Sequence, residues 1–228
     1  LLMLTLSQVF GSQAPLTFGQ SKKILLSLYR ENPFTFYCEC PFNQQGFVTE
    51  SSGYLPESIT DDLLRLEWEH IVPASLLGRS LPGWSGYGCD LTRISARQCC
   101  QKTSREFNLR EANLYNIVPA LKLSNRQRSN FRPGVIANKK NAIRLCQMFI
   151  DKKKRIFEPD DALKGFIART YLRLSSIYDF KISDKERLLF QQWDVLYPKG
   201  DWEKRREVLI EEIYSTNQYQ GDINDKSD

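Results

Sequence analysis

A single histidine, His70, directly follows Glu69, and this pair is the chain's best candidate for chemistry. Histidine is largely uncharged yet still basic near neutral pH, so His70 can act as a general base. A glutamate carboxylate is a hard oxygen ligand that suits magnesium, which commonly takes only one or two protein oxygens. Phosphodiester hydrolysis needs an activated water and stabilisation of charge on the phosphoryl oxygens, which a base and a hard cation together supply.

The Glu-His pair taken alone also has a structural interpretation, because a lone histidine beside a strand is more often a hydrogen-bonded structural residue than a catalyst. The geometry adds a condition. Adjacent residues of a regular strand point to opposite faces, so Glu69 and His70 can serve one site only at a bulge or a strand end. Pro73, three residues further on, favours a strand end.

Positive charge is concentrated in residues 97–155, which hold fifteen Lys and Arg against three Asp and Glu, a local charge of +12. The whole chain carries +5, so the remainder is near −7. Such segregation indicates a polyanionic partner, because contacts with phosphates release counterions and supply most non-specific affinity for nucleic acid. A solvated basic face is the alternative, and Lys152-Lys153-Lys154-Arg155 alone would fit it. The other basic residues are spread through otherwise structured sequence, which favours nucleic-acid binding.

Six cysteines are many for a cytosolic domain, and their spacing includes no C-x-x-C pair of the kind expected in a zinc site. Because the chain has one histidine, zinc would need at least three cysteines, so disulfides are the simpler interpretation. The apolar run 1–6, followed by the small-x-small pattern Ser12-Gln13-Ala14, indicates a signal-peptide remnant over residues 1–14. A short buried N-terminal segment is the alternative. We expect a periplasmic or extracellular protein, with no membrane association in the mature form.

The elements that would position these residues follow from local patterns. Thr17-x-x-Gln20 is a capping box that predicts a helix over 18–29. Aromatic and β-branched residues predict strands at 34–38 and 66–72, and residues 78–96 are expected to form a long surface loop.

The second half of the chain is expected to be helical. The predicted helices lie at 119–128, which opens with a proline, and at 160–178, 183–196 and 202–214. Residues 15–220 are expected to form one domain, and residues 221–228 a flexible tail.

The segment EWEHIVPA, residues 67–74, resembles the active-site strand of the bacterial endonuclease I family of periplasmic and secreted nucleases. The resemblance covers about residues 18–219 and includes TFYC-x-C (35–40), N-x-x-P (116–119), N-x-x-R-x-N (125–130), IARTY (167–171) and YP-x-x-DWE (197–203). It implies an α+β fold: a mixed, mostly helical single domain that contains a ββα-metal nuclease core, in which two strands and a helix hold one divalent ion.

The resemblance also implies residue roles. His70 would be the general base, Glu69 and Asn125 would be the protein's ligands to one Mg²⁺ ion, and Arg97 would hold the scissile or product phosphate. Mn²⁺ or Ca²⁺ could replace Mg²⁺ in binding. The helix that presents Asn125 also carries residues expected to contact nucleic acid, namely Lys122, Arg126 and Arg128.

We therefore expect a secreted or periplasmic, magnesium-dependent endonuclease that acts as a monomer. Its substrate would be DNA, with RNA left open, cleaved without strong sequence specificity to give 5′-phosphate ends. A catalytically inactive, secreted module that binds nucleic acid or anionic glycans is the alternative. A disulfide-stabilised structural or partner-binding protein is a third interpretation, but it gives the +12 segment no purpose.

Overall fold

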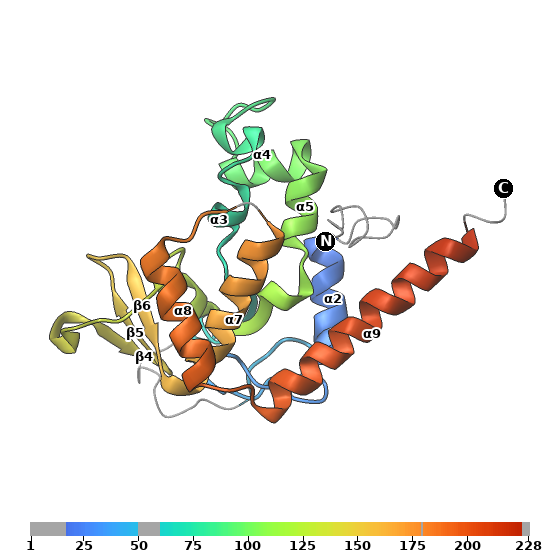
Figure 1. The fold of residues 1–228 in the computed structure, drawn as a ribbon. Helices are drawn as coiled ribbons and strands as arrows, with labels where there is room; N and C mark the ends of the chain where they lie inside the picture. The colour runs from blue at the N-terminus through green and yellow to red at the C-terminus, as the bar shows by residue number, and fades with distance from the viewer. Residues whose placement is uncertain (1–16, 50–59, 179, 225–228) are drawn as a thin grey trace, which may run out of the picture.

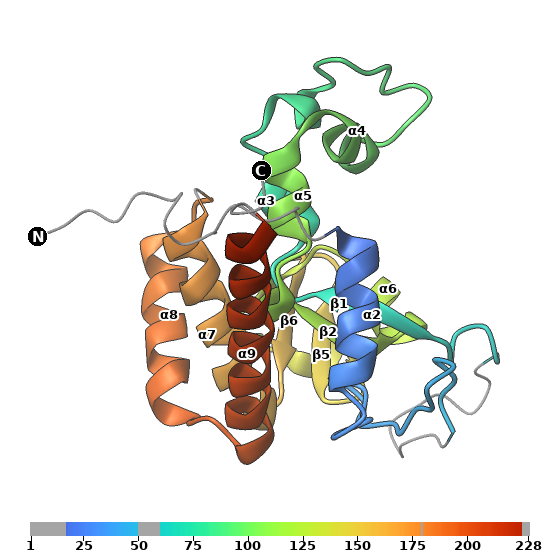
Figure 2. The same cartoon turned by 90° about the vertical axis from the view of Figure 1, so that its right-hand side faces the viewer.

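Two strands far apart in the sequence pair at the centre of the fold (Figure 2). β1 (Leu66–His70) runs antiparallel to β2 (Ile117–Leu121). A short helix, α6 (Lys122–Arg128), begins directly after β2 and contacts β1 through side-chain hydrogen bonds. The order strand, strand, helix agrees with the expected ββα core, here within a mixed α+β single domain.

The structure is a computed structural model and describes residues 17–49, 60–178 and 180–224. The expected signal-peptide remnant at 1–14 lies outside the described residues. The last helix, α9 (Asp201–Asn224), is longer than the helix expected at 202–214 and includes the start of the expected tail. The tail from residue 225 onward lies outside the description.

Helices α2 (Phe18–Leu28) and α9, the first and last helices that the structure describes, cover one face of the β1–β2 pair. α2 begins at the capping box of Thr17 and Gln20, as predicted. Trp68 of β1 and Ile117 of β2 point to this face, because alternate residues of a strand share a face, and they join a hydrophobic cluster with α2 and α9.

The opposite face of the pair meets the larger hydrophobic cluster. Val118 and Ala120 of β2 join it, together with residues of α7 (Asp161–Ile177) and α8 (Asp184–Leu196). The helices α7 and α8 lie side by side in both views (Figure 1 and Figure 2). A second sheet completes this cluster, with its strands in the spatial order β3 (Arg132–Pro133), β6 (Ile156–Pro159), β5 (Met148–Asp151) and β4 (Ile143–Leu145).

A group of short helices stands above the strands in Figure 1 and connects β1 to β2. In chain order these are α3 (Ala74–Gly78), η1 (Pro82–Ser85), α4 (Ala96–Thr103), α5 (Arg105–Glu111) and η2 (Leu114–Asn116). The long loop expected at 78–96 is thus interrupted by η1. A further single-turn helix, η3 (Lys139–Asn141), precedes β4.

Two expected elements are wrong. The helix expected at 119–128 begins only at Lys122, because Pro119 lies opposite Trp68 within β2 and all five residues of β2 are buried. Residues 34–38 form no strand, only an isolated bridge between Phe34 and Pro41 at the base of a turn. Tyr37 in this turn is fully buried, so the aromatic character of the segment reflects core packing rather than strand pairing.

Two disulfides link segments of the chain that are not paired with each other in a sheet. Cys38 is bonded to Cys146 and Cys89 to Cys99, which confirms the expectation of disulfides. Cys40 and Cys100 are buried and lie outside these two bridges. No helix within the described ranges is both long and apolar enough to cross a membrane.

Candidate active site

His70 is the last residue of β1, and its imidazole is held from behind by a backbone carbonyl. The Nε2 atom lies 2.8 Å from the carbonyl oxygen of Glu111, at the end of α5, and the residue is only 6% exposed. A carbonyl oxygen can only accept, so Nε2 must carry the proton of the neutral ring. The lone pair is then on Nδ1, for which no hydrogen bond within the described part of the chain is found. This tautomer leaves Nδ1 available as a base.

An arginine and an aromatic ring adjoin this histidine. The Phe18 ring, from the first turn of α2, lies 4.7 Å from the imidazole, and the Arg97 guanidinium lies 5.5 Å from the centre of the same ring. Arg97 donates from Nε to a carboxylate oxygen of Glu111 at 2.5 Å. Glu111 thus holds His70 through its backbone and Arg97 through its side chain.

The sequence analysis did not predict a role for Glu111. Acidic residues are rare in the basic segment 97–155, where Glu111 is one of only three, and this rarity was the one signal in the sequence that marked it. It is 1% exposed and also accepts a hydrogen bond from Gln101.

Glu69 faces the other side of β1, toward α6. Its carboxylate accepts a hydrogen bond from Nη1 of Arg128 at 2.5 Å, and the side chains of Glu69 and Arg128 are 5% and 1% exposed. The same guanidinium donates to the backbone carbonyls of His70, at 2.9 Å, and Ile71. Arg128 therefore ties the end of β1 to α6. The register of β1 is regular, so Glu69 and His70 point to opposite faces of the strand, and they can serve one site only around the strand end at His70.

Asn125 lies one helical turn before Arg128 and faces the same side of β1. Its Nδ2 donates to Glu67 at 2.8 Å, and Glu67 shares a strand face with Glu69. The hydrogen bonds of the described residues leave Oδ1 of Asn125 and Oε2 of Glu69 without a donor. These are two hard oxygen atoms between β1 and α6.

Burial shifts the pKa values of Glu69 and His70 in opposite directions. Burial raises the pKa of Glu69 to about 7, against the opposing effect of the Arg128 charge. Burial, together with the nearby Arg97 charge, lowers the pKa of His70 to about 4. The imidazole is thus neutral at pH 7, as a general base must be.

Few side chains beside β1 could hold a divalent ion. Within the described residues, no three His, Cys, Asp or Glu side chains gather into a metal-binding group. In the structure Asn125 is hydrogen-bonded to Glu67 rather than to Glu69. Oε2 of Glu69 and Oδ1 of Asn125 are nevertheless hard oxygens of the type that magnesium takes, and magnesium accepts one or two protein oxygens and completes its octahedron with water and substrate. A cation would also offset the cost of burying the Glu69 charge.

The three basic residues expected to contact nucleic acid differ in exposure. Arg126 is exposed. Lys122 is 15% exposed at its side chain and forms an ion pair with Asp62 at 2.6 Å. Arg128 is buried and engaged with β1, so in this structure its side chain is not accessible for the expected contact with nucleic acid.

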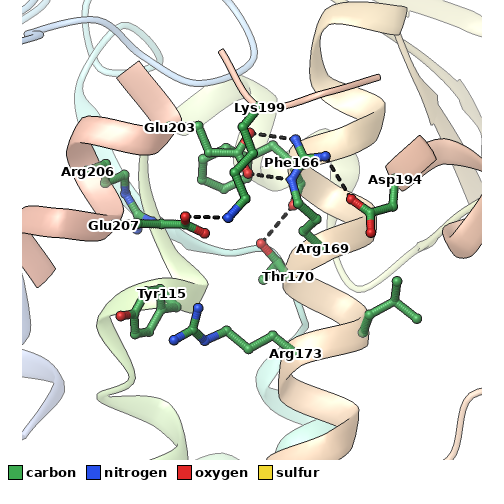
Figure 3. A pocket seen from close by; sticks show the side chains of 11 residues that line it. Tyr115, Phe166, Arg169, Thr170, Arg173, Asp194, Lys199, Glu203, Arg206 and Glu207 are labelled. Atoms are coloured by element: carbon green, nitrogen blue, oxygen red, sulfur yellow. Dashed lines mark hydrogen bonds and ion pairs between the residues drawn. The ribbon is translucent and has the colours of Figure 1, made fainter. Parts of the chain in front are cut away.

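A separate cavity of about 230 Å³ lies among α7, α8, α9 and Tyr115 (Figure 3). In it Arg169 binds Asp194 and Glu203, and the Arg173 guanidinium lies 3.5 Å from the centre of the Tyr115 ring. None of the predicted catalytic or metal-binding residues lines this cavity.

Comparisons with a family model and with individual known proteins identify the same family. The family model described as Endonuclease I matches residues 8–219. A periplasmic deoxyribonuclease of Aeromonas hydrophila is 36% identical over 214 residues, covering 92% of this chain and 86% of the relative. An extracellular deoxyribonuclease of the same species is 37% identical over 199 residues, covering 85% and 83%. Endonuclease-1 of Buchnera aphidicola subsp. Acyrthosiphon pisum is 34% identical over 212 residues, covering 91% and 79%. The resemblance seen in the sequence is thereby confirmed, and the chain belongs to the endonuclease I family.

Proposed function

We propose that this protein is a periplasmic or extracellular, magnesium-dependent endonuclease that hydrolyses DNA without strong sequence specificity. The names of the Aeromonas relatives, a periplasmic and an extracellular deoxyribonuclease, support both the compartment and the substrate. The two disulfides fit an oxidising compartment. Activity on RNA stays a prediction.

The observation that carries the mechanism is the contact between His70 Nε2 and the Glu111 carbonyl. Because this contact fixes the tautomer, Nδ1 accepts the proton of the attacking water. Phe18 and Glu111 hold the ring so that little reorganisation is needed as the proton moves.

Arg97 binds the phosphate in this proposal. Its Nε is occupied by Glu111, so the two terminal nitrogens remain for the phosphoryl oxygens in a planar, bidentate contact. Glu111 thereby orients the Arg97 guanidinium, and it neutralises part of the Arg97 charge when no substrate is bound.

Glu69 and Asn125 would hold the magnesium ion. When bound, the ion would stabilise the negative charge that develops on the phosphoryl oxygens and on the leaving 3′ oxygen. Departure of the 3′ oxygen leaves a 3′-hydroxyl on one fragment and the phosphate on the 5′ end of the other. Glu67 orients the Asn125 amide through Nδ2, so that Oδ1 remains for the ion.

The first experiment is nicking of supercoiled plasmid by the oxidised protein, with magnesium, with EDTA, and with a His70→Ala variant whose fold is verified by circular dichroism. We expect cleavage with magnesium and loss of cleavage in both other cases. An intact variant that nicks as fast as the wild type would remove His70 from the mechanism. If the wild type binds DNA in a salt-dependent way but never cleaves it, the protein is a binding module.

A second variant tests the phosphate contact. Arg97→Ala should lower kcat by about 10²–10³-fold, as expected for removing a donor to developing charge. The matched control is Arg93→Ala, since the Arg93 side chain is 84% exposed and its one ion pair among the described residues is with Asp90 in the same loop. Equal activities of the two variants would exclude Arg97 from catalysis.

A further inference from the structure

Four basic residues form the turn between β5 and β6, Lys152, Lys153, Lys154 and Arg155, here called the basic turn. All four are exposed, and within the described part of the chain none forms an ion pair with a carboxylate. Asp151, the acidic residue directly before the turn, instead accepts a hydrogen bond from the backbone N–H of Lys154 at 2.9 Å. The four cations therefore remain available to an outside anion.

The basic turn is attached to the chain that leaves α6. Arg155 has a left-handed backbone, with φ at 56°, and its carbonyl accepts a hydrogen bond from the N–H of Arg132 at 3.2 Å. Its guanidinium donates to the side chain of Asn130 and lies 5.0 Å from the centre of the Phe131 ring. These contacts fix the turn beside residues 130–132, which almost directly follow α6.

This attachment limits how far the basic turn lies from the candidate active site. From Asn125, α6 advances about 1.5 Å per residue to Arg128, and two further Cα steps of about 3.8 Å reach Asn130. The two Cα atoms are thus at most about 12 Å apart, and adding an arginine side chain sets an upper limit on the order of 20 Å for the distance from Asn125 to the turn. At about 3.4 Å per base pair, that limit corresponds to roughly six base pairs of duplex.

We propose that the basic turn contacts backbone phosphates of the DNA duplex within roughly six base pairs of the cleaved bond. This inference rests on the proposed function and adds to it the direction in which the substrate leaves the active site. Arg126 is exposed on α6 and lies between Asn125 and Asn130 along the chain. Contact with phosphates alone requires no base sequence, which agrees with a non-specific substrate.

The test is the triple variant Lys152→Gln/Lys153→Gln/Lys154→Gln. Its control neutralises three cations of α9 and the segment before it, Lys199→Gln/Lys204→Gln/Arg205→Gln, since α9 lies on the other side of the molecule from β4–β6 in Figure 1. Equilibrium binding to a duplex of about 30 base pairs is measured in EDTA at several salt concentrations. Each lost phosphate contact should reduce the slope of log K against log salt by about 0.9, so the basic-turn variant should lose up to about 2.7.

Cleavage of duplexes of different length gives a second readout. A duplex of about 8 base pairs cut near its centre extends only about four base pairs beyond the cleaved bond, so it offers the basic turn fewer phosphates and should show a smaller difference between the variant and the wild type. The duplex of about 30 base pairs should show a higher KM for the variant, with kcat unchanged. An equal effect at both lengths, or an equal loss of slope in the α9 control, would overturn the inference.

The two proposals fail in distinguishable ways. If the wild type cleaves neither duplex, the proposed function fails, while the binding slopes in EDTA still report on the basic turn. If the variant loses affinity for a heparin fragment but not for the duplex, the turn binds an anionic glycan and the inference is wrong.

Discussion

Replacing Arg128 with methionine tests the central claim about how the site is assembled. The change keeps a long apolar side chain but removes a guanidinium that binds Glu69 and the carbonyls of His70 and Ile71. Because both side chains of the ion pair are almost fully buried, the Glu69 carboxylate is left uncompensated. Breaking one side of such a pair costs about 3–5 kcal/mol. For a chain of this size the thermal midpoint should fall by about 6–20 °C.

The assay is urea denaturation of the oxidised protein at pH 8, followed by tryptophan fluorescence. The matched control is Arg126→Met, on the same helix but exposed, which should change the free energy of unfolding by no more than about 0.5 kcal/mol. The double variant Glu69→Gln/Arg128→Met should recover part of the loss, because it no longer buries a carboxylate. The reasoning is refuted if the free energy of unfolding of Arg128→Met is within about 1 kcal/mol of that of the wild type. It is also refuted if the stability loss of the double variant equals the sum of the losses of Glu69→Gln and Arg128→Met.

Two further predictions concern stability away from the site. Gly165→Ala should be strongly destabilising, because an added Cβ in α7 would lie 2.0 Å from the backbone oxygen of Tyr197; a thermal midpoint equal to that of the wild type would contradict this geometry. Cys38→Ser/Cys146→Ser removes a bridge between residues 108 positions apart and should cost about 4–5 kcal/mol in urea denaturation, through the larger entropy of the unfolded chain. In that experiment, an oxidised wild type no more stable than the variant would show that the bridge does not constrain the unfolded state.

Local patterns predicted the elements whose signals are contained within a few residues. The capping boxes of α2 and α8 and the strand that carries Glu69 and His70 are of this kind. The start of α6 was not predictable in this way, because Pro119 reads as a helix start and only its pairing with Trp68 shows that it belongs to a strand. Such tertiary contacts override local preference.

The second sheet was missed for a related reason. Its strands are two to four residues long, and their pairing joins segments whose hydrophobic pattern is too short to read. Within the candidate site, the charge of Arg128 was visible in the sequence but its burial was not. Glu111 contacts His70 through its backbone carbonyl, a group that every residue has. The pattern of side chains in the sequence therefore could not predict this contact.

The alternation along β1 has a consequence for how this protein can change in length. Glu67 and Glu69 face α6, while Trp68 and His70 face α2. Inserting or deleting one residue in β1 would exchange the two sets, turning the imidazole toward Arg128 and a carboxylate toward Phe18. The loop between η1 and α4 carries no such constraint, so insertions and deletions should accumulate there and be excluded from β1 and β2. The alternation of side chains along β1 and β2 therefore limits where this fold tolerates a change in length. Grafting or loop engineering should leave the ten residues of the two strands unchanged.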